Sequence, residues 1–321
     1  MKIIAFVVYL FLQVAFIPLA IIGVILTGYR QIAVSKQLGV SQTAIEVING
    51  RWTMHIFGIR HDPASAELIH VLPNTSAMGL WLMLFPLWVQ TKISGQLSFY
   101  PRTPQPGDEK ILDLVVARTL YFDNIIDRVI TDVDQFVLMG AGYDTRAYGK
   151  FVETDVVTFE LDQPIVQAHK REMLAKTNID SSNVRFVPVD FTTDDLILKL
   201  TEKGFDASKR TLFLWEGVTL YLSAREIDQT LRFLKDKVGA NSALLVDLYS
   251  DRMFSLVNKS GQGKVLELTD EGLGFGLPFD TNWQQVLRDF VEPKSMKVEE
   301  AHFLGSNDKK GPYAVVAEIL F

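Results

Sequence analysis

The residues best suited to chemistry are two glycines and an aspartate, each of which follows an apolar run. Residues 137–139 are apolar and lead into Gly140-Ala141-Gly142, which indicates a buried strand that turns tightly, with no Cβ where a ligand approaches the backbone. A second apolar run, residues 156–161, is closed by Asp162. On the neighbouring strand, this carboxylate can accept hydrogen bonds from both hydroxyls of a ribose. Glycine turn and acid together predict a pocket for a nucleoside cofactor.

The residues after the glycine turn discriminate between such cofactors. A dinucleotide fingerprint needs a third glycine that opens the next helix, whose N-terminus then meets a pyrophosphate. Thr145 occupies that position, with Asp144 before it and Arg146 after it. A carboxylate there repels a pyrophosphate but tolerates a nucleoside that carries a sulfonium. The pattern favours S-adenosylmethionine over NAD, and it assigns these three residues to fixing the loop rather than to binding a ligand.

Five blocks in a fixed order extend this interpretation over roughly residues 41–321. They carry a resemblance to leucine carboxyl methyltransferase-like enzymes, a family of class I S-adenosylmethionine-dependent methyltransferases. The blocks are ARTLYFD (117–123), LMGAGYDTR (138–146), FELDQP (159–164), VDF (189–191) and WEGVTLYL (215–222).

The resemblance implies that two charged residues serve the amino-acid part of the cofactor. It assigns Arg118 to the methionine carboxylate through a charge-assisted pair, and it places Glu216 near the same part of the cofactor. Arg118 has a structural alternative, a solvated helix position paired with Asp123 or Asp127. Glu216 closes an otherwise apolar strand, where an unpaired charge is costly, so a polar role is expected for it.

The resemblance also implies residues for the nucleoside. It assigns Gly140, with Ala141 and Gly142 in the same turn, to backbone contacts with the cofactor, and it assigns Asp162 to the ribose. Asp190 and Phe191 resemble the pair that holds the adenine, the carboxylate reaching its N6 atom. The alternative for both aspartates is simply to end strands, because aspartate favours turns.

The amino-acid composition gives no indication of nucleic-acid binding, cysteine chemistry or a metal site. The chain has 38 acidic and 32 basic residues, a net charge of −6, and no basic patch with interleaved aromatics, so nucleic-acid binding is not expected. The absence of cysteine excludes disulfides, thiolate nucleophiles and Cys-ligated zinc. The five histidines are scattered without metal-ligand spacing, and no metal is predicted.

An uncharged, apolar segment opens the chain. The run from Ile3 to Leu26, at 1.5 Å per helical residue, is long enough to cover a hydrocarbon core of about 30 Å. It predicts one transmembrane helix; the alternatives are a signal peptide, for which no convincing cleavage site follows, and a buried core helix. Lys2 on one side and Arg30 with Lys36 on the other, together with the cofactor's cytosolic supply, favour a single-pass protein with its catalytic domain on the cytoplasmic side.

A second apolar stretch, residues 77–89, is too short to span. Its aromatic residues suggest a helix or hairpin in the bilayer interface or over an apolar pocket, and an ordinary buried helix is the equal alternative. Residues 50–55 and 61–68 resemble the family's N-terminal cap. The prolines and glycine of residues 101–107 mark a linker.

From residue 108 onward, helices and strands alternate. Helices are expected near residues 111–130, 164–176, 194–203 and 224–237, the last with a capping box at Ser223 and Glu226. Strands are expected at residues 135–139, 156–161, 184–189, 211–215, 242–248, 294–304 and 313–321. The last two lack a helical crossover and predict a hairpin, and the resemblance implies that one of them is antiparallel to the rest.

The fold prediction is therefore α/β: a class I methyltransferase (Rossmann-like) seven-stranded, mostly parallel sheet with helices on both faces. A helical cap and one transmembrane helix are added at the N-terminus. The predicted divisions are a transmembrane anchor at residues 1–34, the cap at 35–107 and the methyltransferase domain at 108–321.

The functional prediction is a membrane-anchored, S-adenosylmethionine-dependent O-methyltransferase. Its acceptor would be a carboxylate or hydroxyl of a lipophilic small molecule presented at the bilayer. A carboxylate needs no general base, and His55 and His61, the only candidate bases by position, are more often packing residues, so no catalytic residue is assigned. The alternatives are a protein C-terminal carboxyl methyltransferase and a non-catalytic cofactor-binding membrane protein.

Overall fold

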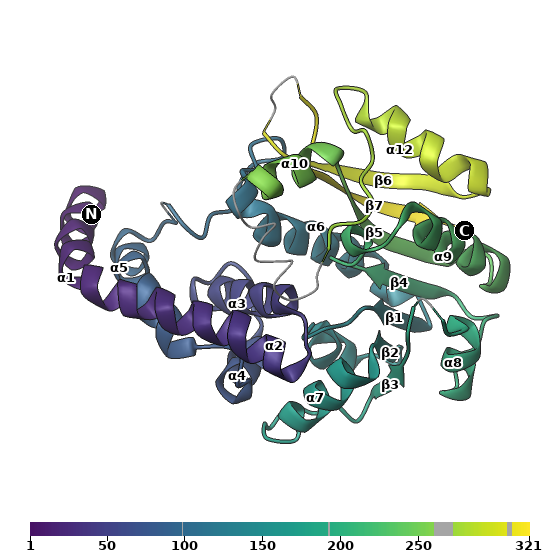
Figure 1. The fold of residues 1–321 in the computed structure, drawn as a ribbon, viewed down its shortest axis with the longest axis horizontal. Helices are drawn as coiled ribbons and strands as arrows, with labels where there is room; N and C mark the ends of the chain where they lie inside the picture. Colours follow the sequence, from purple (N-terminus) through teal and green to yellow (C-terminus); the bar gives the residue numbers. More distant parts are fainter. Residues whose placement is uncertain (98, 192, 260–271, 307–309) are drawn as a thin grey trace. The chain divides into compact units, whose positions relative to one another are not determined.

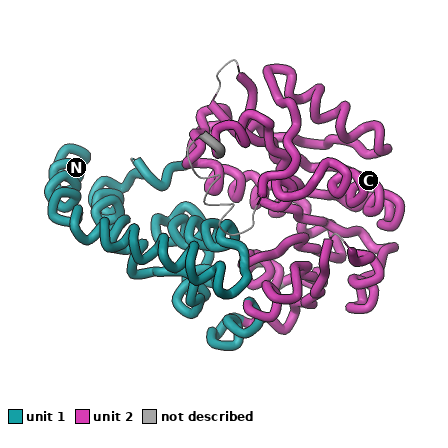
Figure 2. The backbone as a smooth tube through the Cα atoms, viewed as in Figure 1, with its two compact units in different colours: residues 1–103, 170–179 teal, residues 104–169, 180–321 magenta. Residues whose placement is uncertain are grey.

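The computed structural model describes residues 1–321 except 98, 192, 260–271 and 307–309. The chain divides into two compact units (Figure 2). Unit 1 comprises residues 1–103 and 170–179, and unit 2 comprises residues 104–169 and 180–321. The three-part division expected from the sequence remains a prediction.

A seven-stranded sheet forms the centre of unit 2 (Figure 1). Its strand order is β3-β2-β1-β4-β5-β7-β6; β1 to β5 pair in parallel, and β7 is antiparallel to both of its neighbours. The strands are β1 (Gln135–Met139), β2 (Val157–Asp162), β3 (Val184–Pro188), β4 (Thr211–Trp215), β5 (Ala243–Tyr249), β6 (Lys297–Leu304) and β7 (Ala314–Leu320). The predicted sheet, its terminal hairpin and its single antiparallel strand are confirmed.

Helices cover both faces of this sheet. The main apolar core joins one face of the strands to α8, α9 and α12, whereas α6 packs against β6 and β7, where its Arg128 pairs with Glu300 and Glu318 on the opposite face. The helices that begin in unit 2 are α6 (Leu114–Val129), α7 (Pro164–Leu174), α8 (Leu196–Glu202), α9 (Ala224–Lys237), α10 (Asp251–Lys259) and α12 (Trp283–Val291). The predicted capping box of α9 is present, while α10 and α12 were not predicted.

Unit 1 contains the N-terminal helices. They are α1 (Lys2–Tyr29), a π-helical turn (Arg30–Val34), α2 (Ser35–Leu38), α3 (Gln42–Ile56), α4 (Pro63–Val71) and α5 (Ala77–Ser94). The side chains of Ser41, Asp62 and Ser76 cap the starts of α3, α4 and α5 by accepting a backbone N–H. Within the described residues, the continuous helical stretch 2–38 is the one long and apolar enough to cross a membrane, judged by length and composition.

The apolar stretch at residues 77–89 belongs to α5, a single helix of 18 residues. Its first turns pack on α3 and α4: Leu80 is buried with Trp52 of α3 and Ile69 of α4, and Trp81 meets the Trp52 ring edge-on, with centroids 5.6 Å apart. The helix also packs along α1. The start of α5 is thus packed on α3 and α4, and contact of residues 77–89 with lipid remains a prediction.

Candidate cofactor site

The carboxyl ends of the parallel strands gather the residues expected to bind a cofactor. Gly140 follows β1, Asp162 ends β2, and Glu216 follows β4. Because β1, β2 and β4 are parallel neighbours, these residues lie at the same edge of the sheet. The strand order changes direction between β1 and β4, and ligands of open α/β sheets bind in the crevice at such a point.

The glycine turn is hydrogen-bonded to the end of β2. Gly140 and Ala141 each donate a backbone N–H to the carbonyl of Leu161 at 2.9 Å, and Gly142 donates its N–H to Asp162 Oδ2 at 2.6 Å. Gly140 has φ +71°, and a Cβ there would lie 2.5 Å from Cγ2 of Val218. Glycine is therefore required by the backbone conformation and by Val218.

The connection after this turn contains no long helix. Two 3₁₀ turns, Arg146–Tyr148 and Lys150–Glu153, lead from the glycine turn towards β2. A dinucleotide site places its pyrophosphate at the N-terminus of an α-helix in this position. The described connection offers no such helix, in line with the preference for S-adenosylmethionine over NAD.

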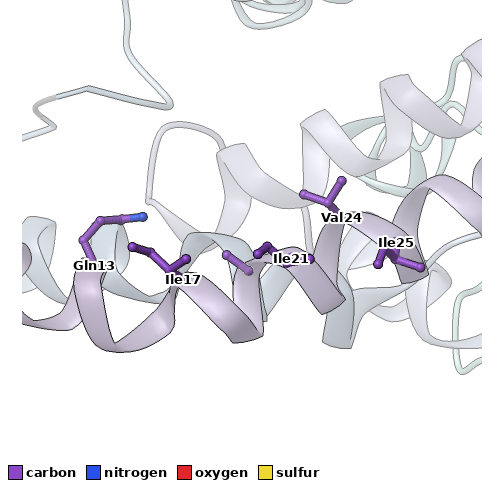
Figure 3. A pocket seen from close by; sticks show the side chains of 6 residues that line it. Gln13, Ile17, Ile21, Val24 and Ile25 are labelled. Atoms are coloured by element: carbon purple, nitrogen blue, oxygen red, sulfur yellow. The ribbon is translucent and has the colours of Figure 1, made fainter.

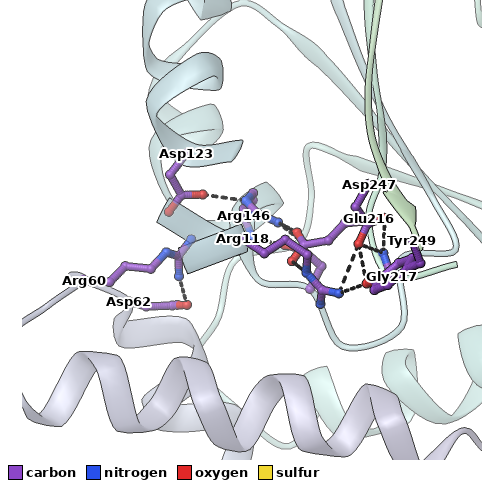
Figure 4. A network of polar contacts seen from close by, with 10 residues as sticks. Arg60, Asp62, Arg118, Asp123, Arg146, Glu216, Gly217, Asp247 and Tyr249 are labelled. Carbon is purple, nitrogen blue, oxygen red and sulfur yellow. Dashed lines mark hydrogen bonds and ion pairs between the residues drawn. The ribbon is translucent and has the colours of Figure 1, made fainter. Parts of the chain in front are cut away.

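Arg118 reaches this edge from α6 and is buried among acceptors (Figure 4). Its Nε donates to Glu216 Oε1 at 3.1 Å, and its Nη1 donates to Asp247 Oδ2 at 3.1 Å and to the Tyr249 hydroxyl at 2.5 Å. None of the hydrogen bonds recorded among the described residues uses Nη2. Arg118 is thus paired with Glu216 and Asp247 rather than with Asp123 or Asp127, and one donor group remains available.

Burial and neighbouring charges shift the pKa values of Arg118 and Asp247 in opposite directions. Burial alone would lower the pKa of Arg118, but Tyr249, Glu216 and Asp247 raise it above the usual value, so the guanidinium stays charged. Burial raises the pKa of Asp247, an effect that Arg118 opposes. Burial also raises the pKa of Tyr249, which keeps its hydroxyl as a neutral donor to Asp247 at 2.6 Å.

A second buried guanidinium shares Glu216. Arg146 donates to Asp123 Oδ1 at 2.7 Å, to Asp144 Oδ2 at 2.6 Å and to Glu216 Oε2 at 2.5 Å. Both carboxylate oxygens of Glu216 therefore accept from an arginine (Figure 4). Glu216 therefore links the two guanidinium groups through its two oxygens.

Asp190 and Phe191 lie on the β3 side of the same edge. Asp190 is exposed, and its backbone N–H donates to Asp194 Oδ2 at 2.9 Å. Phe191 packs, partly buried, at the margin of the main core. The strand order places β3 beyond β2, so these residues and Glu216 flank the glycine turn from opposite sides.

Asp247 and Tyr249 were missed from the sequence. Asp247 lies inside the apolar strand β5, and its side chain is fully buried. The reasoning that singled out Glu216, a charge in an apolar strand that needs a partner, applies equally to Asp247 and could have found it. Among the described residues, no group of three or more His, Cys, Asp and Glu is placed to hold a metal ion.

Comparison with known proteins identifies the family. The leucine carboxyl methyltransferase family profile matches residues 75–235, just over half of the chain. The chain belongs to the leucine carboxyl methyltransferase family. The predicted family is confirmed.

Similar proteins include two mycobacterial relatives, each named "Putative S-adenosyl-L-methionine-dependent methyltransferase". The protein of Mycobacteroides abscessus is 29% identical over 68% of this chain and 70% of its own length. That of Mycobacterium avium is 33% identical over 43% of this chain and 44% of its own length. The first three matches span 59%, 43% and 70% of the relatives' lengths. A solved "putative methyltransferase" of Thermobifida fusca is 16% identical, with 79% of this chain and 93% of that chain covered and a TM-score of 0.48.

Removal of the Arg146 guanidinium should destabilise unit 2 strongly. Arg146→Gln leaves Asp123, Asp144 and Glu216 facing one another without this cation, and breaking a buried ion pair by removing one partner costs roughly 3–5 kcal/mol. Urea unfolding in detergent should show the loss as a lower midpoint. Arg232→Gln, which breaks the exposed pair with Asp228 on α9, is the control and should leave the midpoint unchanged. Equal midpoints for the two variants would contradict the importance given to the buried network.

Proposed function

We propose that the protein is a membrane-anchored, S-adenosylmethionine-dependent O-methyltransferase whose acceptor is a carboxylate or hydroxyl of a lipophilic small molecule. The hydrogen bond from Gly142 to Asp162 carries the cofactor part of this proposal. It joins the glycine turn to the acid on the adjacent strand, and these are the two features from which the nucleoside pocket was predicted. Family membership supports the same cofactor.

The residues at the sheet edge fit the parts of the cofactor in order. Asp190 and Phe191, after β3, would hold the adenine, and Asp162, at the end of β2, would accept from the ribose hydroxyls. The turn Gly140-Ala141-Gly142 would contact the cofactor through its backbone. Arg118 would offer Nη2 to the methionine carboxylate, while Glu216 fixes the direction of that guanidinium through Nε.

The reaction requires little proton transfer by the protein. The cofactor supplies a methyl carbon on sulfonium; an acceptor oxygen bonds to that carbon, and the carbon–sulfur bond breaks with its electron pair left on sulfur. An ionised carboxylate acceptor has no proton to lose. The residues of this chain contribute by alignment and by excluding water, and no catalytic residue is proposed.

Membrane anchoring rests on α1. Its uncharged run exposes large apolar side chains along its length, including Phe11 (77%), Val14 (68%) and Ile25 (63%), a surface that water disfavours and lipid accommodates. With the anchor in the bilayer and the cofactor in the cytosol, we place the catalytic domain on the cytoplasmic side. A lipophilic acceptor then has a direct route from the membrane.

Asp162→Ala should weaken binding of S-adenosylmethionine by roughly 1.5–3 kcal/mol, the scale of hydrogen bonds to a charged group. Isothermal titration calorimetry measures the change, and NAD should give no binding heat with either protein. Asp180→Ala, in the exposed loop before β3, is the control and should bind as the unaltered protein does. An unchanged affinity for Asp162→Ala would remove the ribose assignment, and tight NAD binding would remove the cofactor assignment altogether.

Arg118→Lys should lower cofactor affinity about 10- to 100-fold. In free energy this loss is similar to the one expected for Asp162→Ala. A lysine keeps the charge but cannot hold Glu216 and Asp247 and still present a planar donor to a carboxylate. Arg128→Lys, on the same helix with a half-exposed side chain, is the matched control and should have no effect on affinity. If the Arg118→Lys variant binds the cofactor normally, Nη2 is not the carboxylate ligand.

Methyl transfer is tested with methyl-labelled S-adenosylmethionine and a membrane-lipid extract. We expect the label in an extractable lipophilic product, released by mild base if the acceptor is a carboxylate and retained if it is a hydroxyl. Base-labile label in polypeptide would instead identify a protein carboxyl methyltransferase. Cofactor binding without label in any fraction would favour the non-catalytic alternative.

A further inference from the structure

The helices α1 and α5 pair in antiparallel fashion over most of the length of α1. Arg30 Nη1 donates to the Thr75 carbonyl just before α5 at 2.8 Å. Farther along, the rings of Phe16 and Phe85 stack with centroids 5.1 Å apart, and beyond the end of α5 those of Tyr9 and Phe99 stack at 5.6 Å. Increasing residue numbers in α1 thus meet decreasing numbers in and around α5.

A close backbone crossing joins the pair. A Cβ on Gly23 would lie 2.5 Å from the Gly79 carbonyl oxygen, and one on Gly79 would lie 2.5 Å from Thr27 Oγ1. Ala5, Gly23 and Thr27 are the buried residues of α1. Small residues that allow such an approach are typical of helix pairs in membranes.

Most of the remaining α1 surface is apolar and exposed. Figure 3 shows side chains that line a shallow hollow on it. They are Gln13, Ile17, Ala20, Ile21, Val24 and Ile25. Because the exposed apolar side chains extend along the whole helix, lipid acyl chains fit this surface better than one protein partner, which would cover a single face.

Lys92 shows how the pair is oriented to the bilayer. It lies between Phe85 and Phe99, and so alongside residues 9–16 of α1, whereas the middle of the uncharged run 3–26 falls at residues 14 and 15. The pairs Gly23–Gly79 and Phe16–Phe85 place Lys92 level with residues 9 and 10 of α1. If α1 crossed the membrane upright with α5 attached, the exposed Lys92 would lie inside the hydrocarbon, about 7 Å from its middle at 1.5 Å per residue. A charge inside the hydrocarbon is unfavourable.

The chain beyond α5 is also unfavourable for an upright orientation of the helix pair. The helix ends at Gly95 in the left-handed conformation, and Gly95 and Gln96 are exposed. An upright pair would place this non-helical backbone in the hydrocarbon as well, where exposed peptide groups find no hydrogen-bond partners.

We propose that α1 and α5 form one membrane-embedded helix pair whose axes lie in the plane of a single leaflet. Helices about 10 Å wide fit within half of a hydrocarbon core of about 30 Å. In this orientation α1 faces the acyl chains, whereas Lys92 and Gln96 reach the headgroups. Lys2 and Arg30, at opposite ends of α1, then reach the headgroups of the same leaflet. The inference rests on the proposed membrane anchoring and replaces a single pass with a monotopic one.

The chain lacks cysteine, so single cysteines report topology directly. Lys2→Cys and Gln37→Cys flank the helical stretch, and Ile21→Cys lies on its apolar hollow. In sealed inverted vesicles and in spheroplasts, a membrane-impermeant maleimide should label positions 2 and 37 from the cytoplasmic face alone, and position 21 only after detergent is added. Labelling of positions 2 and 37 from opposite faces would overturn the proposal in favour of a single pass.

Two further results complete the test. Labelling at position 21 in intact membranes would show that protein or water, and not lipid, meets α1, which would overturn the proposal. A Phe16→Cys, Phe85→Cys protein should form an intramolecular disulfide under mild oxidation in membranes, and failure to form it would overturn the pairing. Adding Gly23→Leu should reduce that cross-link severalfold, whereas Gly28→Leu, whose added Cβ meets nothing within 4 Å, should not. Because none of these measurements depends on cofactor or turnover, they fail independently of the methyltransferase assignment.

Discussion

Glu216 is shared by two buried guanidinium groups, and the arrangement of the candidate site depends on this shared carboxylate. Arg118 comes from α6 and Arg146 from the turn after β1, whereas Glu216 follows β4. A buried charge is tolerated only when it is paired. Three elements far apart in the sequence are thus held in register, because a shift of any one of them would break at least one buried ion pair.

The same pairing limits what the site can do. With both oxygens of Glu216 accepting from arginine and Asp247 accepting from Arg118, Tyr249 and the Gly217 amide, the acidic groups near Arg118 serve to orient it. Such an environment can hold a charged ligand in a fixed direction. A carboxylate acceptor, which arrives already ionised, makes the least demand on it.

The sequence predicted the sheet closely because its central strands are buried on both faces. Runs such as Gln135–Met139 and Thr211–Trp215 are apolar after a first polar residue and are followed by glycine or an acid, and the predicted bounds of both agree with the structure. The helices α10 and α12 were not predicted. The partners of Arg118 could not be predicted either, since Asp247 lies 129 positions away and only the sheet order brings the two together. Arg146 looked like a loop residue, and its contact with Glu216 depends on the same tertiary arrangement.

The two units differ in which side chains they bury and which they expose. In unit 2, the charges around Glu216 are buried and paired with one another. In unit 1, α1 exposes large apolar side chains along its length, a surface that a non-aqueous surrounding would stabilise. Length and hydropathy, which the sequence provides, cannot give the direction of such a helix, because an upright and a flat helix have the same composition. The direction proposed for α1 follows from what lies beside it: the crossing of Gly23 and Gly79 fixes α5 against α1, and α5 brings Lys92 to a level that would be inside the hydrocarbon if the helix were upright.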